Sequence, residues 1–144
     1  MHDNICLKHM GEICIDHETQ DFINKSVLVL CGAGSDRSKL ISDELNERGY
    51  MSSHRGVNWG DNKVESQDLD YIGIVIFSSF NEKREFDKLY PKLSNKIQKN
   101  KIKVFVFDIT ESDKNRAYDS NKIDNLKKQI SKDLDNINLF NINR

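Results

Sequence analysis

The chain has 144 residues, which is enough for one compact domain with a hydrophobic core and too few for two ordinary domains. Its 22 Lys and Arg residues nearly balance its 23 Asp and Glu residues, and the net charge of −1 gives no basis for binding nucleic acid or a membrane through overall charge. The sequence has neither a run of about 18 apolar residues nor a basic-then-apolar secretory signal. We therefore expect a cytoplasmic monomer without nucleic-acid or membrane partners.

Residues 1–24 are interpreted as an N-terminal extension that precedes a single α/β domain at 25–144. The segments Ile5–His9 and Ile13–His17 echo each other across Gly11, which predicts a two-stranded hairpin. The echo contains two Cys-x2-His pairs whose spacing could hold zinc: Cys6, His9, Cys14 and His17. Because one short echo is weak evidence for a metal site, we favour incidental Cys and His residues and expect no metal and no other cofactor.

Four short apolar runs predict β-strands, at residues 26–30, 51–57, 72–77 and 102–107. A first helix is predicted from Ser38 to Gly49, with an inward face of Leu40, Ile41 and Leu45. Helical spacing follows the third run, where Pro91 should kink the helix or open a second one. A last helix is capped by Ser120 or Asp119, and its buried stripe is Ile123, Leu126, Ile130, Leu134 and Ile137.

This alternation predicts a single α/β domain with a doubly wound, four-stranded parallel sheet flanked by helices. Ligands of such sheets bind at the carboxyl ends of the strands. Cys31 and Asp108 directly follow two of the predicted strands. We therefore expect both residues at one edge of the sheet.

A Gly-rich segment from Cys31 to Ser38 joins the first predicted strand to the first helix. Backbone N–H groups and the dipole at a helix start bind a phosphate dianion and stabilise a thiolate. Arg37 can grip two phosphate oxygens, and the Ser38 hydroxyl can donate to the Cys31 sulfur. We predict Cys31 and Arg37 as catalytic residues, with a phosphate-binding set of Gly32, Ala33, Gly34, Ser35, Asp36, Arg37 and Ser38. A chemically inert Gly-rich turn is the alternative.

At these residues the chain resembles the cysteine phosphatases with a Cys-x5-Arg-Ser signature, and the position of the loop after the first strand is similar to their low-molecular-weight class. The resemblance follows the order of elements over residues 26–130, with further similar segments at Arg55-Gly56-Val57 and Phe107-Asp108-Ile109. It implies a doubly wound phosphatase-like fold and hydrolysis of a phosphomonoester through phosphocysteine, without a cofactor. The implied substrate is a phosphorylated protein, above all phosphotyrosine, or a small phosphomonoester.

The loop departs from that family at three positions. Gly34 stands where the family usually has Asn, Lys39 where it has Pro, and Asp36 puts a carboxylate beside the arginine. The loop also resembles the IIB domains of the sugar phosphotransferase system, which often read Cys-Gly-x-Gly and usually have a small residue in place of Arg37. A phosphocysteine transfer domain of that kind and a non-catalytic phosphate-binding module are therefore the alternative functions.

The resemblance implies a carboxylic acid, downstream of the last strands, that protonates the leaving group. The candidates are Asp108, Glu111, Asp113 and Asp119. We favour Asp113, with Glu111 and Asp108 as alternatives. Trp59, after the second strand, could stack on a phosphotyrosine ring at the substrate rim, or pack half-buried against the sheet.

Overall fold

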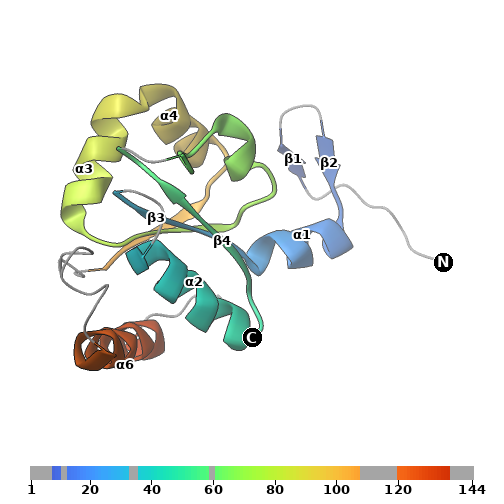
Figure 1. Cartoon of the computed structure of the whole chain (residues 1–144). Coiled ribbons are helices and arrows are strands. Elements are labelled where there is room, and N and C mark those ends of the chain that lie inside the picture. The colour runs from blue at the N-terminus through green and yellow to red at the C-terminus, as the bar shows by residue number, and fades with distance from the viewer. Residues whose placement is uncertain (1–7, 11–12, 33–35, 59–60, 108–119, 137–144) are drawn as a thin grey trace.

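The computed structural model describes residues 8–10, 13–32, 36–58, 61–107 and 120–136 (Figure 1). Its centre is a parallel sheet with the strand order β4-β3-β5-β6. The four strands are β3 (Ser26–Cys31), β4 (Met51–Gly56), β5 (Ile74–Phe77) and β6 (Lys103–Val106). The predicted four-stranded parallel sheet is therefore confirmed, with each predicted strand present and its ends shifted by no more than about two residues.

Strand β3 lies between β4 and β5, and all six of its residues are buried. Its sequence Ser-Val-Leu-Val-Leu-Cys is almost wholly apolar because both faces of a central parallel strand are covered. The chain leaves β3 toward β4 on one side and later returns to β5 on the other side. The carboxyl end of β3 therefore lies at the switch point where ligands bind in such sheets.

Helices cover both faces of the sheet, as Figure 1 shows. On one face, α2 (Asp36–Glu47) and α6 (Ser120–Asn136) pack on the sheet through Ile41, Leu45, Leu126, Ile130 and Leu134. On the other face, α3 (Phe80–Leu89) and α4 (Pro91–Lys99) contribute Phe86 and Ile97. The predicted doubly wound arrangement is therefore confirmed. None of the helices in the described segments is long and apolar enough to cross a bilayer.

Helix α2 begins at Asp36, two residues before the predicted start at Ser38. This difference places Arg37 and Ser38 in the first turn of the helix. Gly49 follows the helix with φ +95°, a left-handed conformation that glycine adopts without steric cost. Arg48 connects the C-terminal end of α2 to α6, because its guanidinium donates to Asp135 Oδ1 at 2.8 Å and to Ser131 Oγ at 2.9 Å.

Pro91 opens a second helix, which was one of the two predicted outcomes, and stands at the first position of α4. In α6, the predicted buried residues Leu126, Ile130 and Leu134 are confirmed. Of the two predicted cap residues, Ser120 is the first residue of α6, while Asp119 lies outside the described residues, as do the side chains of Ile123 and Ile137.

The N-terminal segment contains the predicted hairpin, with β1 (Lys8–Met10) antiparallel to β2 (Ile13–Ile15). It continues into α1 (His17–Asn24), which the sequence analysis did not predict. Asp16 caps this helix: Thr19 N–H donates to its Oδ1 at 2.8 Å and thereby lowers the pKa of the carboxyl from its ordinary value of 3.8. A one-turn 3₁₀ helix, η1 (Ser66–Leu69), was also not predicted.

Gly73, just before β5, fixes where the end of α1 meets the sheet. A Cβ at this position would lie 2.4 Å from the carbonyl oxygen of Ile23 and 3.3 Å from the Cα of Asn24. Both are backbone atoms, so Gly73→Ala must displace the backbone where the end of α1 leads into β3. We expect the free energy of unfolding to fall by about 1–3 kcal/mol, measured by urea denaturation. Gly49→Asn is the control without steric overlap, because a Cβ there would have no atom within 4 Å; the strain at φ +95° should cost less, about 1 kcal/mol. An unchanged value for Gly73→Ala would contradict the packing described here.

Candidate functional site

The candidate site lies at the carboxyl edge of the sheet, around the last residue of β3. Cys31 pairs in register with Gly56 of β4 and is 0% exposed. Its carbonyl oxygen accepts a hydrogen bond from Val57 N–H at 2.8 Å, and that of Gly32 accepts one from Asn58 N–H at 2.9 Å. The backbone from the Cys31 carbonyl to the Gly32 carbonyl is therefore fixed by the two residues that follow β4.

The Cys31 thiol contacts the first turn of helix α2. Its Sγ lies 3.2 Å from Ser38 Oγ, within hydrogen-bonding distance, and both residues are completely buried. The sequence analysis predicted this pair from the eight-residue segment alone. The two residues can meet because β3 ends at Cys31 and α2 begins at Asp36, two residues before Ser38. The N–H groups of that helix start are directed toward the same edge of the sheet.

Arg37 is held by a carboxylate that the sequence analysis missed. Its Nη2 lies 2.6 Å from Oε1 of Glu82, which is in the first turn of α3. The side chains of Arg37 and Glu82 are 13% and 5% exposed, so this ion pair is largely withdrawn from water. Screening by solvent is weak there, and the pair fixes the guanidinium at the carboxyl edge of the sheet, next to the residues that follow β5.

Glu82 is itself fixed by the two serines that follow β5. Ser78 Oγ donates to Oε1 at 3.2 Å and Ser79 Oγ donates to Oε2 at 2.9 Å. Ser78 N–H also donates to the carbonyl of Leu30 in β3, at 2.9 Å. The sequence contains a pattern that could have drawn attention to Glu82. Ser79-x-x-Glu82, which follows an apolar run, has the form of a helix capping box.

The opposite rim of the site is built by the residues that follow β4. Asn58 Nδ2 donates to Glu85 Oε1 at 3.1 Å, and Tyr90 Oη donates to the carbonyl of Val57 at 2.7 Å. The first contact joins this rim to α3, and the second joins it to Tyr90, which lies between α3 and α4. Trp59, the predicted rim residue, lies outside the described residues.

Several predicted site residues cannot be placed in the same way. Gly32 is buried, and Asp36 is the first residue of α2. Seven predicted site residues lie outside the described segments: Ala33, Gly34, Ser35, Asp108, Glu111, Asp113 and Asp119. The general acid and residues 33–35 of the phosphate-binding loop therefore stay predictions.

Arg55, which the sequence analysis compared with a family segment, is engaged elsewhere. Its Nε lies 3.2 Å from Asp68 Oδ1 and ties β4 to η1. In the hairpin, the register sets His9 opposite Cys14, while Cys6 lies outside the described residues and His17 is exposed. Within the described segments, no group of three or more His, Cys, Asp or Glu side chains could hold a metal ion.

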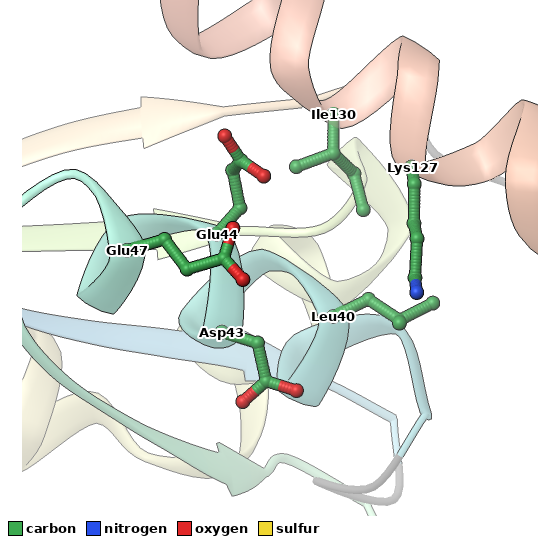
Figure 2. Close-up of a pocket in the computed structure, with 6 residues that line it drawn as sticks. All are labelled: Leu40, Asp43, Glu44, Glu47, Lys127 and Ile130. Carbon is green, nitrogen blue, oxygen red and sulfur yellow. The ribbon is translucent and has the colours of Figure 1, made fainter.

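A pocket of about 170 Å³ lies elsewhere, between α2 and α6 (Figure 2). It is lined by Leu40, Asp43, Glu44, Glu47, Lys127 and Ile130. Asp43 and Glu44 already pair with Lys39 and Arg48, each at 2.9 Å. The pocket contains none of the predicted site residues, so the predicted chemistry does not involve it.

Comparison with known proteins assigns the chain to no family. No protein-family model, no curated protein and no solved structure matches it. The function must therefore be argued from the arrangement around Cys31, Arg37, Ser38 and Glu82.

Proposed function

We propose that the protein is a cysteine-dependent phosphomonoester hydrolase, with the fold and mechanism of the low-molecular-weight phosphatases. The observation that carries the proposal is the 3.2 Å contact between Cys31 Sγ and Ser38 Oγ at the carboxyl end of β3. A thiol at a strand end, against the first turn of a helix, is where a thiolate nucleophile and a phosphate are both stabilised.

The proposed reaction begins with attack of the Cys31 sulfur on phosphorus. An S–P bond forms while the P–O ester bond breaks, and the leaving oxygen takes a proton from a carboxylic acid. Arg37 and the backbone N–H groups of the loop hold the phosphoryl oxygens. Asp113 is proposed as the acid, with Glu111 and Asp108 as the alternatives.

In the second step, water attacks the phosphocysteine and the P–S bond breaks. The same carboxylate accepts the proton of the water, and the sulfur leaves as a thiolate. The Ser38 hydroxyl supports this departure because it lies within hydrogen-bonding distance of Sγ. The step needs no metal, and inorganic phosphate is released.

The proposed substrate is a phosphorylated protein side chain, above all phosphotyrosine, or a small phosphomonoester. We further propose that the protein acts as a monomer in the cytoplasm, without nucleic-acid or membrane partners. Its near-neutral net charge of −1 is consistent with recognition through the site and not through a charged surface.

One observation favours the second candidate, a phosphocysteine transfer domain. Glu82 neutralises part of the charge of Arg37, at 2.6 Å, and a hydrolase depends on that charge more than a transfer domain does. In a transfer domain, Cys31 would keep the phosphoryl group until an acceptor hydroxyl replaced water in the second step.

Hydrolysis of p-nitrophenyl phosphate by the reduced protein, with and without vanadate, separates the two candidates. Turnover that vanadate blocks supports the hydrolase, because vanadate mimics the phosphoryl group in the transition state. A stable phosphoprotein without turnover would favour the transfer domain. Neither turnover nor phosphorylation would contradict both.

A further inference from the structure

The buried contact between Arg37 and Glu82 carries an inference that rests on the proposed function and extends it. Glu82 belongs to α3 and Arg37 to α2, so this ion pair connects two helices that lie on opposite faces of the sheet. We propose that Glu82 is the positioning residue that orients the Arg37 guanidinium toward the oxyanion held above Cys31.

The Glu82 carboxylate is itself held rigidly by two serines. Oε1 accepts from Ser78 Oγ at 3.2 Å and Oε2 accepts from Ser79 Oγ at 2.9 Å. Both serines and Glu82 are at most 4% exposed. Ser78 N–H is bonded to the carbonyl of Leu30, one residue before Cys31. A continuous series of hydrogen bonds therefore runs from β3 to the guanidinium.

The planar shape of the Arg37 guanidinium also supports a positioning role for Glu82. It is planar and has five N–H donors, so fixing Nη2 on a carboxylate also fixes the direction of the others. Orientation established before substrate binds lowers the barrier, and a misplacement of about 1 Å can reduce the rate about 100-fold. A lysine or a free arginine at this position would have to be ordered in each catalytic cycle.

Three roles for Glu82 predict different results for Glu82→Gln. A positioning residue predicts that kcat for p-nitrophenyl phosphate falls about 10–100-fold, with KM changed less than about threefold. A purely structural residue predicts lower thermal stability with unchanged kinetics below the unfolding transition. A residue that only neutralises Arg37 predicts tighter oxyanion binding and faster turnover.

A second measurement gives an answer even for a protein without turnover. Cys31 is alkylated with iodoacetate or iodoacetamide, and the modified peptide is quantified by mass spectrometry. An oriented Arg37 favours the anionic reagent, so we expect the preference for iodoacetate to fall at least about threefold in Glu82→Gln. An unchanged or increased preference would overturn the positioning role, whatever the outcome for the hydrolase.

Three further variants keep the test specific. In an Arg37→Ala background, Glu82→Gln should cause no further loss of kcat or of reagent preference, since Glu82 acts only through Arg37. Glu44→Gln breaks a second Glu–Arg pair, with Arg48, and should change neither quantity. Ser79→Ala removes one contact of Glu82 and covers the case in which Glu82→Gln does not fold; it should shift both quantities in the same direction by less. No shift in Ser79→Ala would then contradict the inference.

Discussion

Cys31→Ser is expected to reduce the hydrolysis of p-nitrophenyl phosphate by at least about 10⁴-fold, because a serine hydroxyl at this position is not the activated nucleophile that a thiolate is. The variant should fold, since serine is similar in size to cysteine. Its hydroxyl can still pair with Ser38 Oγ, which lies 3.2 Å from the Cys31 sulfur in the unaltered protein. Steady-state kinetics measure the loss, and circular dichroism with thermal unfolding measures the fold.

The matched controls for this variant are Cys6→Ser and Cys14→Ser, which change the other two cysteines of the chain. Both should retain the rate of the unaltered protein, because only Cys31 stands at the carboxyl end of the central strand. Full activity in Cys31→Ser would refute the proposed mechanism, as would a similar loss in either control.

Arg37→Lys should lower kcat about 10²–10³-fold while the protein remains folded. Lysine keeps the positive charge, but its ammonium group is a single point charge. It cannot contact Glu82 Oε1 and two phosphoryl oxygens with the fixed geometry of a guanidinium. The loss would be measured as kcat and KM for p-nitrophenyl phosphate, and as the inhibition constant of vanadate.

Arg84→Lys is the matched control for this substitution, because Arg84 is exposed on α3 and donates a long hydrogen bond of 3.4 Å to Asn81 Oδ1. We expect no change in kcat for this control. Equal activity of Arg37→Lys and Arg84→Lys would mean that the guanidinium of Arg37 takes no part in stabilising the transition state.

The sheet could be predicted because its strands are short apolar runs whose composition reflects burial on both faces. All six residues of β3 and all four residues of β5 are buried. The contact between Cys31 and Ser38 could be predicted for a similar reason. A strand that feeds directly into a helix leaves little freedom for the positions of the residues at the junction.

Other features could not be predicted because their determinants lie far apart in the sequence. Glu82 is 45 residues from Arg37 in the numbering of the chain, and only the arrangement of α2 and α3 around the sheet brings them together. Helix α1 is short and mostly polar, with Ile23 as its buried residue, so its helical periodicity is weak. The tight junction at Gly73 depends on the backbone of Ile23, which no local pattern reveals.

The central claim is that Cys31 accepts a phosphoryl group, and rapid acid quenching during turnover tests it most directly. The protein is mixed with p-nitrophenyl phosphate, quenched, digested and analysed by mass spectrometry. We expect one phosphoryl group on the peptide that contains Cys31, absent in Cys31→Ser and in protein inhibited by vanadate. Turnover without phosphorylation of Cys31, or with the phosphoryl group on another residue, would contradict it.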